Sequence, residues 1–146
     1  QLNCTYYSAL GNNDDAYLLA RAIQFFTPGV PQVYYVGLLA GENDIELLEE
    51  TKVGRNINRH YYTLEEAEET MNRPVVKKLF ELMRFRNSYP VFDGQFSAVA
   101  VGQEGLKLTW EDGVYRAILE CNLKTHGFQI RYWSPESESE VALALE

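Results

Sequence analysis

The chain has 146 residues, of which 46% are hydrophobic, and a formal net charge of −8. This length and hydrophobic content suffice for one globular domain with a sizeable core and exclude a disordered chain. The acidic balance argues against a nucleic-acid-binding protein, because phosphate contacts need a basic surface. No apolar run approaches the roughly 20 residues of a membrane span, so we expect no membrane partner.

Cysteines and histidines give no pattern typical of a metal or redox site. Cys4 and Cys121 lie far apart and have no motif spacing, which predicts two buried free thiols in a reducing compartment and hence a cytoplasmic protein. His60 and His126 are too distant in sequence to suggest a metal pair. We therefore expect neither a metal nor another cofactor.

The first 90 residues read as an α/β segment. A cap at residues 12–15 and apolar residues at helical spacing predict a helix that Thr27-Pro28-Gly29 ends. The short apolar run Gln32–Val36 reads as a strand buried on both faces, typical of a parallel sheet. A short helix from an Asn43 cap to Glu50 follows, and Thr63 with Glu66 predicts a capping box. Pro74 suits the first position of a longer helix that reaches about Asn87.

From Val91 onwards the helical period is absent and strand patterns replace it. Four strands are expected, joined in part by turns at Asp112-Gly113 and at residues 125–127. Their ranges are Gln95–Val101, Leu106–Glu111, Tyr115–Cys121 and Phe128–Trp133. This predicts a small antiparallel β domain over residues 91–133. Residues 134–146 read as a frayed, disordered acidic tail in which Val141–Leu145 could form one helical turn.

The strongest candidate for a binding site is a basic loop beyond the predicted strand end. Lys52, Arg55, Arg59 and His60 fall within nine residues of an otherwise acidic chain. Their role is either anion or sugar binding or local pairing with nearby glutamates, and the composition leaves both open. Gly54 favours a functional role for Arg55, because a glycine could let the backbone turn this side chain inward.

Tyrosines and carboxylates are further candidates, the first for a sugar site and the second for catalysis. Ten tyrosines, several in pairs near the predicted strand end, suit a sugar site, although packing is the commoner role of such rings. Retaining glycosyl transfer needs two carboxyl groups about 5 Å apart, and no pair stands out. Glu42 and Asp44 are the best local candidates, whereas Asp14 and Asp15 read as helix-cap residues. We therefore assign no catalytic residue to the chain.

Six runs of this sequence resemble one enzyme family with high specificity. They are TYYSALG (residues 5–11), FTPGVPQVYYVG (26–37), AGEND (40–44), GRNINRHYY (54–62), RPVV (73–76) and FRN (85–87). The chain is similar in these runs to the carboxyl-terminal part of the sucrose phosphorylases, in the α-amylase superfamily (glycoside hydrolase family 13). The resemblance covers residues 1 to about 94, is faint over residues 95–133 and is absent from the tail.

The resemblance implies a fold and a reaction. Residues 1–90 would be the end of a (β/α)8 TIM barrel, with 32–36 as its eighth strand, followed by the family's small β domain. The whole enzyme would convert sucrose and phosphate to glucose 1-phosphate and fructose through a covalent glucosyl-enzyme, with retention. Its nucleophile, its acid/base residue and its stabilising aspartate would lie earlier in a longer chain, in keeping with a sequence that opens on Gln1. The present chain would then be inactive alone.

The resemblance also implies two substrate-binding residues and several partners. Arg55 matches the arginine that contacts the glucosyl unit, and Gln1 falls at the end of a mobile loop that borders the acceptor and phosphate site. Asn56 stands where many relatives have aspartate, which leaves the acceptor open between fructose, fructose 6-phosphate and glycerate. The expected partners are sucrose or a related glucoside, phosphate and the missing part of the barrel, with self-association as a further option. A non-catalytic carbohydrate-binding module and a truncated product without a role remain the alternatives.

Overall fold

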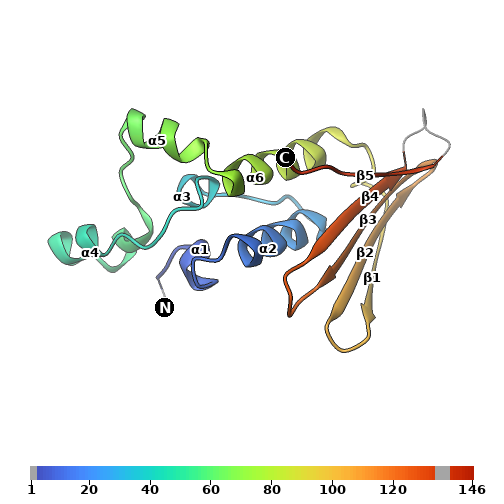
Figure 1. Ribbon diagram of the computed structural model, residues 1–146, viewed down its shortest axis with the longest axis horizontal. Coiled ribbons are helices and arrows are strands. Elements are labelled where there is room, and N and C mark those ends of the chain that lie inside the picture. Colours follow the sequence, from blue (N-terminus) through green and yellow to red (C-terminus); the bar gives the residue numbers. More distant parts are fainter. Residues whose placement is uncertain (1–2, 134–138) are drawn as a thin grey trace. The chain divides into compact units, whose positions relative to one another are not determined.

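The computed structural model describes residues 3–133 and 139–146, and its elements follow one another as helices and then strands (Figure 1). The helices are α1 (Tyr6–Ala9), α2 (Asp14–Phe26), α3 (Tyr35–Leu38), α4 (Ile45–Thr51), the 3-10 helix η1 (Gly54–Asn58), α5 (Leu64–Met71) and α6 (Pro74–Ser88). The strands are β1 (Gln95–Val101), β2 (Gly105–Asp112), β3 (Tyr115–Asn122), β4 (Phe128–Trp133) and β5 (Glu140–Ala142).

These elements form two compact units whose sequences interleave. The first unit comprises the residues up to Leu18 together with Gln32–Leu79, and the second comprises Leu19–Pro31 together with Phe80–Glu146. Helices α2 and α6 each run from one unit into the other. The domain boundary expected near residue 90 stays a prediction. None of the helices described is long and apolar enough to cross a membrane.

Helix α2 begins and ends where the sequence predicts. The side chain of Asn13 accepts a hydrogen bond from the backbone N–H of Ala16 at 2.9 Å, which satisfies one of the unpaired donors of the first turn. Asp14 and Asp15 occupy that turn, where negative charge suits the helix dipole. The helix ends at Phe26, two residues before Pro28, because proline cannot continue it.

The predicted buried strand Gln32–Val36 is wrong for this chain. Tyr34 has an extended backbone (φ −73°, ψ 153°), but helix α3 begins at Tyr35, and no strand pairs with this segment anywhere in residues 3–133 or 139–146. Val36 is buried, whereas Tyr34 and Tyr35 are exposed. A strand needs neighbours that accept and donate its backbone hydrogen bonds, and the described chain supplies none here.

The other helices of the first unit confirm most of the local predictions. Asp44, rather than Asn43, caps α4: its side chain accepts from the backbone N–H of Leu47. Thr63 and Glu66 form the predicted capping box at the start of α5. Pro74 is the first residue of α6, as expected from its missing N–H. The segment before α2 contains the single-turn helix α1.

The second unit contains a five-stranded antiparallel sheet in which strand order follows chain order. The four predicted strands are confirmed to within a residue at each end, and Gly113, with φ of +59°, turns β2 into β3. A fifth strand, β5, lies where a helical turn was predicted, so that prediction is wrong: Leu143 N–H donates to the carbonyl of Ile130 and β5 pairs with β4. The rest of the tail prediction, residues 134–138, lies outside the described residues.

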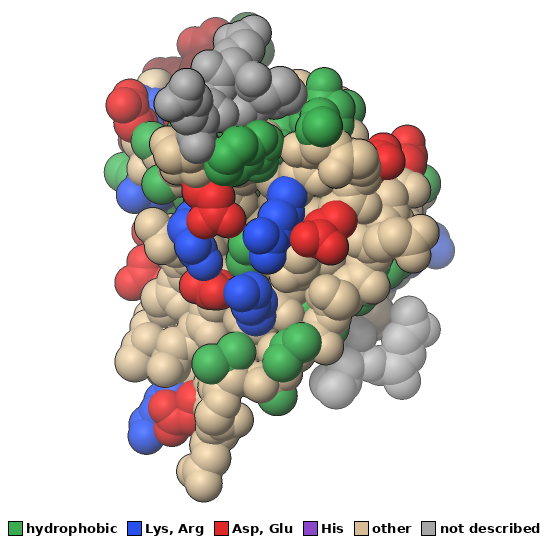
Figure 2. Space-filling view, turned by 90° about the vertical axis from the view of Figure 1, so that its right-hand side faces the viewer, with side chains coloured by type: hydrophobic (Ala, Val, Ile, Leu, Met, Phe, Trp, Pro, Cys, Tyr) green, Lys and Arg blue, Asp and Glu red, His purple; other side chains and the backbone are tan. Residues whose placement is uncertain are grey.

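The two faces of this sheet differ in character. One face carries a row of buried apolar residues in register, Leu108, Leu119 and Ile130. On the other face acidic and basic side chains alternate (Figure 2). These form a chain of ion pairs from Lys107 to Glu120 (3.2 Å), on to Arg131 (3.0 Å) and then to Glu140 (2.9 Å).

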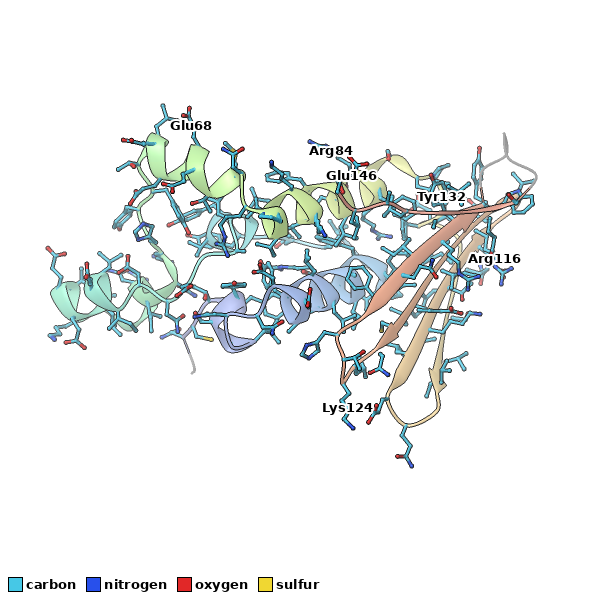
Figure 3. The ribbon with its side chains drawn as sticks, in the orientation of Figure 1. Glu68, Arg84, Arg116, Lys124, Tyr132 and Glu146 are labelled. Atoms are coloured by element: carbon cyan, nitrogen blue, oxygen red, sulfur yellow. The ribbon has the colours of Figure 1, made fainter. Side chains whose placement is uncertain are left out.

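Side chains at the sheet ends follow the same division (Figure 3). Tyr132 lies on the apolar face, and its ring centroid is 5.2 Å from those of both Phe85 and Tyr89. Arg116 lies on the charged face and pairs with Glu111 at 3.2 Å. The alternation of strand residues thus separates packing from charge within the second unit.

Candidate functional site

Helix α4 and the basic loop together form one segment, residues 44–60, whose two ends meet at Asp44. The backbone N–H of Asp44 donates to the carbonyl of Ile57 at 2.7 Å, and its Oδ2 lies 2.6 Å from Nδ1 of His60. Its other carboxylate oxygen accepts from Leu47 N–H at 2.8 Å. These hydrogen bonds, first the one from Leu47 and then the one from His60, lower the pKa of the Asp44 carboxyl group. Asp44 is therefore an ionised anchor for the loop.

Arg55 lies on η1 and is exposed. Within the described ranges its guanidinium has no hydrogen-bond or ion-pair partner. Gly54 is not among the glycines with a positive φ, so its backbone conformation does not itself require glycine. A Cβ there would lie 3.3 Å from the side-chain amide nitrogen of Asn3, so the glycine's small size lets the start of the described chain approach this loop. Because the Arg55 guanidinium is exposed and unpaired within the described ranges, it is available to a ligand.

The other cations of the basic loop have different surroundings. Lys52 pairs with Glu49 at 2.5 Å, which is the local pairing that the sequence left open. His60 lies between two carboxylates: Asp44 is in hydrogen-bond contact, and Oε1 of Glu66 is 3.9 Å from its Nε2. Arg59 is half-buried. The structure thus separates Arg55 from Lys52 and His60, which have carboxylate partners.

A shallow cavity of about 440 Å³ opens beside the Asp44–His60 pair. It is lined by residues 41–46 together with His60, Tyr62, Thr70 and Arg73. Burial raises the pKa of Tyr62, so this hydroxyl stays neutral. A Cβ on Gly41 would meet this hydroxyl at 2.3 Å, so the close packing of the cavity wall requires glycine.

Arg73 fastens the segment that leads to the cavity, a role that sequence reasoning missed. Its guanidinium donates to the carbonyl of Ala40 at 3.0 Å and to the hydroxyl of Tyr7 at 3.3 Å, and it pairs with Asp14 at 3.8 Å. Ala40 has a positive φ of 47°, uncommon for a residue with a side chain. In the sequence, only the run RPVV (residues 73–76) indicated Arg73, and this run does not predict the hydrogen-bond partners of its guanidinium.

Most tyrosines of the first unit pack against other rings or donate a hydrogen bond to a backbone carbonyl. Tyr7 and Tyr17 are buried with their rings edge to face at 5.3 Å, and the Tyr17 hydroxyl donates to the carbonyl of Gly37. The Tyr35 hydroxyl donates to the carbonyl of His60 at 2.9 Å. Tyr34 and Tyr61 remain 56% and 70% exposed. Tyr34 and Tyr61 are the most exposed rings of these pairs. Tyr35 links two of the pairs, since its ring centroid lies 4.6 Å from that of Tyr34 and 6.3 Å from that of Tyr62.

The carboxylates weighed as catalytic candidates do not form a catalytic pair. Both oxygens of Asp44 are engaged, as described above, and Asp14 accepts a hydrogen bond from the Tyr7 hydroxyl at 2.7 Å. Glu42 lines the cavity together with Asp44 and Glu46, and no hydrogen bond joins it to either of these carboxylates. Gln1, the other predicted substrate-binding residue, lies outside the described residues. Cys4 is exposed and Cys121 buried, both as free thiols, so the prediction of two buried thiols is wrong for Cys4.

Comparison with known proteins gives relatives along nearly the whole chain. No profile of a known protein family matches it. The sucrose 6(F)-phosphate phosphorylase of Thermoanaerobacterium thermosaccharolyticum is 54% identical over 94% of this chain and 28% of that protein. The sucrose phosphorylase of Bifidobacterium adolescentis is 56% identical over 82% of this chain and 24% of that protein. This chain therefore spans about a quarter of the length of these relatives.

A solved structure extends the likeness to three dimensions. The crystal structure of a sucrose 6F-phosphate phosphorylase from Thermoanaerobacter thermosaccharolyticum superposes on 97% of this chain with a TM-score of 0.93 and 53% identity. The superposition includes 29% of that protein's own chain. The likeness thus extends through the β strands, where the sequence resemblance was faint.

Proposed function

Since the chain belongs to the sucrose phosphorylase family of glycoside hydrolase family 13, as a relative of its carboxyl-terminal part, we propose that it completes a retaining glucosyltransferase. The proposed reaction of the whole enzyme converts sucrose and phosphate to glucose 1-phosphate and fructose. The observation that carries this proposal is the close match over 94% of this chain against only 28% of the relative.

Alone, the chain is expected to be inactive in this reaction. Retaining transfer needs a nucleophilic carboxylate and an acid/base carboxyl group about 5 Å apart. The best-placed carboxylate, Asp44, is held by Leu47 and His60 and has a lowered pKa, which suits an anchor better than a proton donor. The catalytic acids are therefore assigned to a preceding part of a longer protein.

Arg55 is assigned to substrate binding in that enzyme. Its exposed guanidinium, without a partner among the described residues, suits the hydroxyl groups of a glucosyl unit. Gln1 is assigned to the same site, and the position of Asn3 against Gly54 supports this pairing. The acceptor is fructose in the leading proposal. Fructose 6-phosphate is the first alternative, since a 54% identical relative is named for sucrose 6(F)-phosphate, and glycerate is the second.

The proposed partner is the missing part of the barrel. Tyr34 and Tyr61 are large exposed side chains, and the backbone at Tyr34 is extended without a pairing strand in the described chain. The Tyr34 carbonyl accepts from the Leu38 N–H, and the extended backbone before it is the part that can pair with a neighbouring strand. The same backbone would favour self-association when that partner is absent. The two free thiols suit a reducing compartment, which keeps a cytoplasmic location in the proposal.

The test is complementation in trans. The T. thermosaccharolyticum relative, truncated before the region that matches this chain, is mixed with the purified chain, and release of glucose 1-phosphate from sucrose or sucrose 6-phosphate is measured. Neither part should turn over alone, and the mixture should. Arg55→Ala should abolish turnover, whereas Arg59→Ala, the matched control in the same loop, should leave most of it. Turnover by this chain alone would overturn the proposal.

A carbohydrate-binding module is the rival function. The exposed rings of Tyr34 and Tyr61 are the feature that favours it, because ring faces cover the apolar side of a pyranose. Calorimetric titration of the chain with glucose and maltooligosaccharides separates the two functions. The enzyme proposal expects no measurable heat of binding from the chain alone, and the rival expects saturable binding that Tyr61→Ala removes.

A further inference from the structure

The loop that carries Arg55 has no fully buried hydrophobic anchor of its own. Neither α4 nor η1 contains a buried residue. In most loops of this length, apolar side chains inserted into the core would fix the position of the tip. Here the apolar side chains of Leu47, Leu48 and Ile57 are only half-buried, so the polar contacts at the two ends of the loop matter more for where Arg55 lies.

These end contacts converge on a single pair. Asp44 precedes the loop and His60 follows it, and their side chains meet at 2.6 Å between Oδ2 and Nδ1. The Asp44 N–H to Ile57 carbonyl bond, at 2.7 Å, closes the same ring from the backbone. The Asp44 carboxylate is 15% exposed and the imidazole 35% exposed, so solvent screens this contact less than it screens a surface ion pair.

His60 is itself held from outside the loop. Its carbonyl accepts from the Tyr35 hydroxyl at 2.9 Å, its ring meets Tyr62 edge to face at 4.6 Å, and its Nε2 faces Glu66. Three contacts from residues beyond the loop therefore hold His60, one at its backbone carbonyl and two at its imidazole. The imidazole in turn fixes Asp44, and Asp44 fixes both ends of the loop.

We infer that Asp44 and His60 are positioning residues for Arg55: they form a clasp that holds the arginine-bearing loop Ile45–Arg59 at one place. The clasp itself stands on the geometry of this chain, whereas its consequence for turnover rests on the proposed function of Arg55. Neither residue is assigned a contact with the substrate. Both act through the loop.

The first test needs only this chain. Asp44→Asn preserves the helix cap, since asparagine caps as well as aspartate, but removes the charged partner of His60. His60→Phe preserves the ring against Tyr62 but removes the hydrogen bond. Amide hydrogen exchange, read residue by residue, should accelerate on the order of tenfold at position 44 and at Asn56 and Arg59 in both variants, because a charge-assisted hydrogen bond is lost.

Two controls decide what that acceleration means. Glu66→Gln weakens only the 3.9 Å contact and should leave the exchange at position 44 unchanged. The double variant Asp44→Asn/His60→Phe should exchange no faster than either single variant, because both remove one interaction. Unchanged exchange in the loop would overturn the clasp. Equal acceleration throughout residues 3–18 and 32–79 would also overturn it, since the pair would then support the whole unit.

The second test uses the complemented enzyme. His60→Phe should lower kcat/KM for the glucosyl donor roughly tenfold, and adding it to Arg55→Lys should cause no further loss, because one residue acts through the other. Independent, multiplicative losses would overturn the positioning role. If the mixture shows no turnover at all, the proposed function fails, and the exchange measurements on the single chain still decide whether the clasp exists.

Discussion

The indole Nε1 of Trp110 donates a hydrogen bond to the carbonyl of Phe26 at 2.7 Å, although 84 residues separate them in sequence. Phe26 is the last residue of α2, and the final carbonyls of a helix have no partner within the helix. The indole supplies that partner from the apolar face of the sheet. The Trp110 side chain thus bonds the segment Leu19–Pro31 of the second unit to its segment Phe80–Glu146.

Trp110→Phe should therefore destabilise the second unit by about 1–3 kcal/mol, because the buried carbonyl of Phe26 loses its donor. The measurement is the urea dependence of unfolding, followed by far-ultraviolet circular dichroism. Trp133→Phe is the matched control: Trp133 is only half-buried, and the change should shift the midpoint much less. An equal shift for both variants would assign the effect to lost ring size.

Gly41→Ala should destabilise the first unit by about 1–3 kcal/mol. The added methyl group would lie 2.3 Å from the Tyr62 hydroxyl and 2.7 Å from Cγ1 of Val36, and buried side chains have little room to shift. Adding Tyr62→Phe should recover part of the loss by removing one of the two clashes. Gly127→Ala is the control, since its nearest contact is 3.6 Å away; a similar loss there would contradict the steric explanation.

The sequence predicted correctly those helices and strands that depend on caps, turns and residue alternation within a few residues. Helix α2 depends on the Asn13 cap and on Pro28, and the sheet depends on alternation and on the turn at Gly113; all of these can be read within a few residues. The segment 32–36 could not be predicted this way. Its composition is typical of a buried strand, but a strand forms only beside other strands, and the described chain supplies none.

The candidate site shows the same limit. Sequence reasoning selected Arg55 and grouped it with three other cations, but it could not tell that Lys52 and His60 have carboxylate partners. The pairing of Asp44 with His60 spans sixteen residues, and the approach of Gly41 to Tyr62 spans twenty-one, with no periodic signal in either case. Such contacts follow from how the loop closes, and loop closure is a property of the folded unit.

Stability of α4 should fall at low pH because of Asp44. Its pKa is lower in the folded chain than in the unfolded chain, so the stabilisation is complete above the unfolded value of about 3.9 and is lost as the pH falls through the folded value. Exchange at the Leu47 amide, measured from pH 5 to pH 2 and corrected for its intrinsic rate, should rise in that window. Asp44→Asn should remove this dependence, whereas a persisting rise would assign it to another carboxylate.

On the charged face of the sheet, the ion pairs of Arg131 should contribute less to stability than burial of Ile118. Ile118 lies opposite Arg131 in register and is 2% exposed, so Ile118→Ala should cost about 2–5 kcal/mol through the cavity that it leaves. Arg131→Gln breaks the pairs with Glu120 and Glu140, which are partly exposed, and should cost about 1 kcal/mol or less. Urea unfolding in low salt and in 1 M sodium chloride separates the two terms, because only the arginine effect should shrink on screening. A larger loss for Arg131→Gln than for Ile118→Ala would show that the ion pairs, rather than packing, hold this face together.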